Sequence, residues 1–116
     1  MVQKLESSAF ILEEKTEWEQ LSKGVKRQIL GFNKDLMMVK VAFESGIVSD
    51  PHSHPHTQVT YIASGTFKFN VGEKSSVVKA GDSVYIESDK IHNCECIESG
   101  VLLDTFAPMR EDFLKK

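Results

Sequence analysis

The sequence predicts an all-β fold, either a sandwich or a barrel, and three observations support this class. Short runs of alternating apolar and polar residues recur along the chain, and a period of two is typical of strands with one buried face. Helical periodicity is weak in almost every window. Glycines, which can supply the positive φ of tight turns, separate the runs at Gly24, Gly46, Gly65, Gly72, Gly81 and Gly100.

The clearest strand is TFKFNV, in which Phe67, Phe69 and Val71 share one face and the polar residues share the other. Similar runs predict strands near residues 9–12, 25–32, 36–44, 58–64, 66–71, 75–79, 83–87, 92–97 and 101–107. Two stretches differ. EEKTEWEQLSKG predicts about a turn of helix, and PMREDFLKK predicts a short C-terminal helix that Pro108 could start.

A chain of 116 residues is long enough for one domain with its own core and too short for two. We expect a single domain over residues 1–116, with a barrel core at about 25–107, an N-terminal strand arm at 1–24 and a C-terminal helix at 108–116.

The charge and composition exclude several classes of partner. The net charge is −3 and no basic stripe is present, so nucleic acid is not an expected partner. Neither a secretory signal nor an apolar run of about 18 residues occurs, so we expect no membrane segment and a cytoplasmic location. Cys94 and Cys96 are poorly spaced for a disulfide and are interpreted as small buried residues, with a redox or metal role as the alternative.

The stretch HSHPHTQ contains three of the four histidines of the chain. On an extended backbone, His52 and His54 project from the same side, which suits chelation of a metal. Gln58 has the same parity, but Pro55 and Thr57 interrupt the strand and leave its position open. The cluster alone indicates either a metal site or a polar surface loop.

The spacing around this cluster resembles the first motif of the cupins. It runs Gly46, five residues, His52, one residue, His54, three residues, Gln58, six residues, Gly65. Glutamine replaces the more usual glutamate.

A second stretch resembles the second cupin motif. It runs Gly81, five residues, Glu87, Ser88, Asp89, two residues, His92, three residues, Cys96. Glu87, Asp89 and Cys96 replace the usual proline, glycine and asparagine, so the loop shape is less well matched than the histidine.

The resemblance implies a single-domain cupin, which is a jelly-roll β-barrel whose interior binds one divalent transition metal ion (Ni, Fe, Mn, Co or Zn). It implies His52, His54, Gln58 and His92 as the metal ligands, and it leaves His56 as a rim residue. Imidazoles and an amide oxygen suit such an ion. A glutamine in place of a carboxylate removes one negative charge and leaves the metal more electrophilic.

The last predicted strand has a second polar cluster. Asp104 and Phe106 share the parity of Leu102, so a carboxylate faces the interior if Leu102 does. A buried carboxylate is costly unless it is paired or hydrogen-bonded. Arg110 is close enough in sequence to reach the same end of the barrel, either as an active-site group or as the partner of Asp104 in a structural ion pair.

The run DTFAPMREDF resembles the C-terminal signature of the small pectin-degradation (KdgF-like) cupins. That family implies non-redox, isomerase- or lyase-like ring opening of 4,5-unsaturated uronate monosaccharides from pectin or alginate to linear 4-deoxy-5-keto uronates. It implies Asp104, Phe106 and Arg110 as catalytic residues and a sugar acid as substrate. We expect the metal to hold the substrate's carboxylate and Asp104 to move a proton.

Two other functions fit the same motifs. One is a different metallo-cupin enzyme, a dioxygenase or a sugar isomerase, and the other is a non-enzymatic cupin that binds a sugar or another small molecule. A homodimer is also expected, with an interface formed by Phe10, Ile11, Val25, Ile29 and Phe32. Trp18 is either a core anchor or an interface residue.

Overall fold

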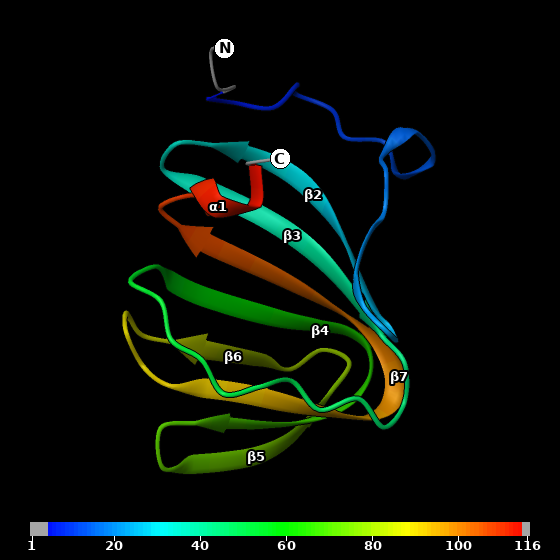
Figure 1. Ribbon diagram of the computed structural model, residues 1–116, viewed down its shortest axis with the longest axis vertical. Coiled ribbons are helices and arrows are strands. Elements are labelled where there is room, and N and C mark those ends of the chain that lie inside the picture. The colour runs from blue at the N-terminus through cyan, green and yellow to red at the C-terminus, as the bar shows by residue number, and fades with distance from the viewer. Residues whose placement is uncertain (1–4, 115–116) are drawn as a thin grey trace.

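In the computed structural model, which describes residues 5–114, antiparallel strands form one strongly curved sheet (Figure 1). The strands pair in the order β1-β2-β3-β7-β4-β5, and β6 pairs with β4. The strands are β1 (Glu19–Ser22), β2 (Val25–Asn33), β3 (Leu36–Phe43), β4 (Thr57–Val71), β5 (Lys74–Lys79), β6 (Ser83–Ile86) and β7 (His92–Ala107). A 3-10 turn, η1 (Glu13–Lys15), and one helical turn, α1 (Glu111–Leu114), complete the described chain. The all-β prediction is confirmed.

Two predicted strand breaks, at Gly65 and Gly100, are wrong because β4 and β7 continue through them. The two strands bend together at this corner, so the sheet folds over and encloses an interior (Figure 1). Gly65 has a φ of +83°, and a Cβ added there would lie 2.6 Å from the Cα of Gly100. The glycines are therefore needed for close backbone contact at a bend, whereas elsewhere they mark turns.

The N-terminal predictions were partly wrong. Residues 9–12 form no strand, and the predicted helix reduces to η1 followed by β1. The amide nitrogen of Gln28 donates to the Thr16 carbonyl at 2.9 Å, and Lys26 lies 4.4 Å from the centre of the Trp18 ring. These side-chain contacts hold the segment on the outer side of β2. In addition, β1 pairs with β2 through its backbone, which satisfies hydrogen-bonding groups that a short isolated helix would leave unpaired.

The C-terminal helix begins later than predicted. It begins at Glu111, after a turn that follows Pro108, and it is described to Leu114. Residues 115–116 of the predicted helix, and residues 1–4 of the predicted N-terminal arm, lie outside the described part of the chain.

The strand periodicity places the apolar residues as predicted. Phe67 and Phe69 are buried, and so are Leu102 and Phe106. They belong to two core clusters on the inner side of the curved sheet. One cluster contains Val25, Met37, Val39, Val41, Phe106 and Met109, and the other contains Ile62, Phe67, Phe69, Cys94, Cys96 and Leu102.

The residues predicted to form the dimer interface differ in how far they are exposed. Val25 is buried, whereas Ile29 and Phe32 are partly buried and pack against the first core cluster. Phe10 is 84% exposed, and Trp18 packs on Lys26 rather than in the core. The homodimer stays a prediction. No helix in the described residues is long and apolar enough to cross a membrane.

Candidate metal centre

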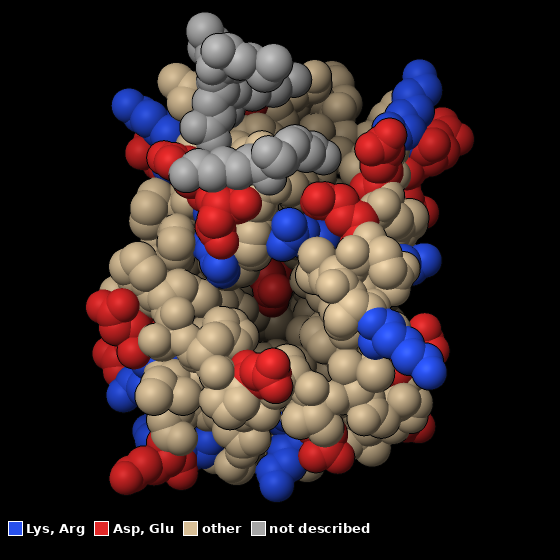
Figure 2. All heavy atoms as spheres, viewed as in Figure 1, with Lys and Arg blue, Asp and Glu red and all other residues tan. Residues whose placement is uncertain are grey.

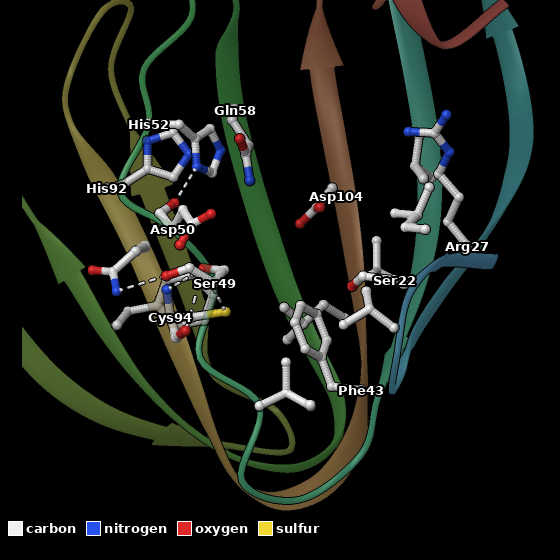
Figure 3. Close-up of a pocket in the computed structure, with 18 of the residues that line it drawn as sticks. Ser22, Arg27, Phe43, Ser49, Asp50, His52, Gln58, His92, Cys94 and Asp104 are labelled. Atoms are coloured by element: carbon white, nitrogen blue, oxygen red, sulfur yellow. Dashed lines mark hydrogen bonds between the residues drawn. The ribbon is translucent and has the colours of Figure 1, made fainter. Parts of the chain in front are cut away.

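Two segments that are distant in sequence, residues 52–58 and the start of β7, bring the predicted ligands together. His52 and His54 lie in the segment that connects β3 to β4, Gln58 is near the start of β4, and His92 begins β7. Backbone hydrogen bonds join His52 and His92 in both directions, at 3.0 and 2.9 Å. One ligand atom from each of the three histidines lies within 4.8 Å of the others, and Figure 3 shows His52 and His92 beside Gln58.

Each histidine ring is oriented by a backbone carbonyl. The Nδ1 atom of His52 lies 2.9 Å from the backbone oxygen of Asp50. The Nδ1 atom of His54 lies 3.1 Å from the backbone oxygen of His56, and the Nδ1 atom of His92 lies 2.8 Å from the backbone oxygen of Lys90. A carbonyl oxygen only accepts, so Nδ1 carries the proton in every ring and Nε2 keeps its lone pair. Such second contacts are typical of metal-binding histidines.

Two of these Nε2 atoms lie in settings that suit a metal ligand. The Nε2 atom of His92 is buried and has no hydrogen-bond partner among the described residues. The Nε2 of His54 lies 2.9 Å from the Oε1 of Gln58, although both atoms are acceptors in this arrangement. Burial lowers the pKa of His54 and of His92, which favours the neutral, metal-binding form. The donor set therefore fits a divalent metal ion.

A buried hydroxyl connects this centre to Asp104. The side-chain amide nitrogen of Gln58 donates to Thr60 Oγ1 at 2.9 Å, and Thr60 Oγ1 donates to Asp104 Oδ1 at 2.6 Å. Because an ionised carboxylate only accepts, the Thr60 proton points to Asp104 and the hydroxyl oxygen accepts from Gln58. The amide oxygen of Gln58 is thereby turned toward the histidines.

Asp104 faces the interior from the last part of β7, as its parity with Leu102 predicted, and its carboxylate points into the space between the histidines and β2 (Figure 3). Burial raises the pKa of Asp104 to about 6, although the hydrogen bonds from Thr60 and Gln58 and the nearby Arg110 oppose this shift. A carboxyl group with such a pKa can both accept and release a proton near neutral pH.

Arg110 does not form the ion pair with Asp104 that was considered from the sequence. Its Nε and one terminal nitrogen bond both oxygens of Asp112 at 3.1 and 3.0 Å. Its guanidinium also lies 5.0 Å from the centre of the Phe106 ring. Arg110 and Phe106 nevertheless line the same cavity as Asp104.

The cavity has a volume of about 420 Å³ and is bordered by His52, His92 and Gln58 as well as by Asp104, Phe106 and Arg110. In the space-filling view, a central hollow contains an acidic side chain at its base and a basic side chain at its rim (Figure 2). Three of the four predicted metal ligands and the predicted catalytic residues thus line one cavity.

Sequence reasoning missed three residues of this site. Thr60 has the same parity as Gln58, which was the available signal for its inward position. Arg27 and Phe113 also line the cavity. Arg27 alternates with Val25 and Ile29 and therefore shares their inward side of the strand. A charged residue at such a position was the signal that could have identified it. For Phe113 the sequence contained none, because its position depends on how α1 folds back.

The remaining histidine and the cysteines are not part of the cluster of potential ligands found among the described residues. His56 is half-buried, and its backbone oxygen, not its ring, orients His54. Cys94 and Cys96 are buried and unpaired. Burial raises the pKa of Cys94 to about 12 and also raises that of Cys96. Such thiols behave as small apolar residues.

Comparisons with known proteins agree with this architecture. Residues 39–106 match the model of the cupin domain family. The chain is 38% identical over 107 residues to the pectin degradation protein KdgF of Dickeya dadantii (strain 3937), covering 90% of this chain and 97% of that protein.

Two solved structures are also similar. An RmlC-like cupin from Shewanella frigidimarina has a TM-score of 0.92 and 43% identity, with 95% of this chain and 99% of that chain covered. KdgF from Halomonas sp. has a TM-score of 0.89 and 28% identity, with 93% and 100% covered. The chain therefore belongs to the cupin family and, within it, groups with the pectin degradation protein KdgF.

Proposed function

We propose that this protein is a metal-dependent enzyme that opens the ring of 4,5-unsaturated uronate monosaccharides to give linear 4-deoxy-5-keto uronates. The observation that carries the proposal is the shared cavity. Its wall includes Gln58 and two histidines of the three-histidine cluster, together with a buried carboxyl group of raised pKa, Asp104. The similarity to a pectin degradation protein supports a sugar acid as the substrate class.

His52, His54, Gln58 and His92 would hold the metal ion, which, when bound, supplies Lewis-acid polarisation of a substrate oxygen. Phe106 packs against His54, with ring centres 5.6 Å apart, and presents an apolar wall that would exclude water from the sugar ring. The free terminal nitrogen of Arg110 would donate to a substrate oxygen.

Asp104 would move the proton. In its ionised form it accepts the proton of the C1 hydroxyl, the bond from C1 to the ring oxygen breaks, and C1 becomes an aldehyde carbon. The electrons of the broken bond stay on the former ring oxygen and leave an enolate at C5, which becomes the ketone when C4 takes up the proton from the protonated Asp104. The reaction is an isomerisation, so it needs no oxidant or second substrate.

The test follows loss of the double-bond absorbance of an unsaturated galacturonate with metal-loaded protein, against the spontaneous rate. Asp104→Asn should lower kcat by roughly a hundredfold or more, as for removal of a general acid–base group, and His52→Ala should lower activity together with metal content. Unchanged rates in both variants would refute the assignment of this site.

The same assay separates the two alternatives. Full activity under anaerobic conditions with a redox-inert metal ion excludes dioxygenase chemistry. Tight binding of the uronate without any acceleration of ring opening would instead identify a binding protein.

A further inference from the structure

We propose that Arg27 on β2 binds the carboxylate of the substrate, and that Phe113 of α1 holds the Arg27 guanidinium in place. The inference rests on the proposed ring-opening function and assigns an anion subsite to the end of the cavity that lies away from the metal centre.

The position of Arg27 is unusual for a charged residue. It lies on the inward face of β2, in register with Val41 of β3, and it lines the cavity. Its side chain is only 14% exposed. Glu19 accepts one hydrogen bond from Nε at 3.2 Å, and the two terminal nitrogens make no hydrogen bond within residues 5–114. A nearly buried guanidinium thus keeps donors available at a cavity wall.

Phe113 fixes the plane of this guanidinium. The Cζ of Arg27 lies 3.9 Å from the centre of the Phe113 ring, and the Cζ of Arg110 lies 4.2 Å from the same centre. The Phe106 ring meets Phe113 edge-on, with centres 5.7 Å apart. A guanidinium stacked on an aromatic face keeps its donors at the edge, where they can bind a planar anion.

Arg27 is better suited than Arg110 to bind a carboxylate with two hydrogen bonds. Asp112 already occupies Nε and one terminal nitrogen of Arg110, which leaves a single terminal group. Glu19 occupies only Nε of Arg27. Two parallel N–H donors from one guanidinium match the two oxygens of a carboxylate.

The placement of Arg27 sets the orientation of the substrate. Figure 3 shows Arg27 on the side of the cavity opposite His52 and His92, with Asp104 between them. A uronate whose carboxylate binds Arg27 would present its ring to Asp104 and its hydroxyl oxygens to the metal ligands. This orientation is the reverse of the one expected from the sequence, in which the metal holds the carboxylate.

The experiment compares the unsaturated uronate with its methyl ester, which lacks the negative charge, in the wild type and in Arg27→Gln. We expect KM for the acid to rise by about 10- to 100-fold, as for loss of hydrogen bonds to a charged group, with kcat changed less than about threefold. The preference for the acid over the ester should fall by the same factor. Lys26→Gln removes one positive charge from the opposite face of β2 and should leave both values unchanged.

Phe113→Leu provides a second variant that keeps an apolar side chain at the position. It should raise KM for the acid in the same direction and leave the bound metal unchanged, because none of the predicted ligands contacts Phe113. Arg27→Lys keeps the charge without the planar pair of donors and should recover only part of the affinity.

If Arg27→Gln raises KM equally for the acid and the ester, or changes neither KM, the assignment of Arg27 is overturned even though the ring-opening activity stands. If the wild type itself does not accelerate ring opening, the proposed function fails and the carboxylate assignment fails with it. The wild-type rate therefore separates the two failures.

Discussion

At the level of single residues, the hydroxyl of Thr60 determines how the metal centre and the carboxyl group of Asp104 are related. Thr60 is fully buried and accepts from Gln58 while it donates to Asp104. An amide side chain can present either its oxygen or its nitrogen to a metal, and only the oxygen binds. The direction of these two hydrogen bonds selects the oxygen.

Thr60→Val should therefore impair catalysis more than Thr60→Ser, which keeps the hydroxyl. We expect kcat to fall by roughly tenfold or more in Thr60→Val. The free energy of unfolding should fall by about 1–3 kcal/mol, because Gln58 and Asp104 lose buried hydrogen bonds. Steady-state kinetics and urea unfolding of both variants provide the measurement. Equal kcat values for the two variants would show that the hydroxyl has no such role.

At the level of elements, the shared bend of β4 and β7 creates the cavity. The first part of β4 carries Gln58 and Thr60, and the last part of β7 carries Asp104 and Phe106. The part of β4 after Gly65 pairs with the part of β7 before Gly100. This second half of the pair brings His92, and the loop with His52 that is bonded to it, over the first half. Without the bend, the ligands on β4 and β7 would lie along one flat sheet.

Gly65→Ala tests the bend, and Gly81→Ala is its matched control. Both glycines have positive φ, +83° and +97°, so alanine strains the backbone at each position. Only at Gly65 would the new Cβ meet backbone atoms, whereas at Gly81 nothing lies within 4 Å. We expect Gly65→Ala to lower the free energy of unfolding by about 2 kcal/mol more than Gly81→Ala, measured by urea unfolding. Similar losses would contradict the close contact at the corner.

At the level of the whole molecule, the candidate ligands come from segments that are far apart in the sequence. His52 and His54 come from the loop before β4, and His92 comes from the start of β7. A bound metal ion would stabilise the folded protein relative to the unfolded chain, in which these groups are far apart.

Removal of the metal with a chelator should therefore lower Tm, and re-addition should restore it. At a free metal concentration about 100 times Kd, the stabilisation should be about 2.7 kcal/mol. His92→Ala should weaken metal binding by about a hundredfold or more. His56→Ala should keep it, because the backbone oxygen that orients His54 remains and the His56 ring is not part of the histidine cluster. Calorimetric titration of both variants with the metal ion measures this affinity. An equal loss of metal affinity in the two variants would contradict the ligand assignment.

The sequence predicted the features that depend on local spacing. Alternation along the strands placed Phe67, Phe69, Leu102 and Asp104 on the inner face. The three apolar residues are buried, and Asp104 lines the cavity. The cupin-like spacing brought His52, His54, Gln58 and His92 into one candidate set. Parity follows directly from the backbone geometry of a strand, so it survives without knowledge of the fold.

Only the tertiary structure decided what depends on contacts between distant segments. Gly65 and Gly100 have the same local signature as the turn glycines, and their role at the bend arises because two strands cross there. Arg110 was close enough in sequence to pair with Asp104, but Asp112 on the next helical turn binds it instead. The stacking of Arg27 on Phe113 joins β2 to α1. Local sequence fixes which way a side chain points, and the packing of distant segments fixes what it meets.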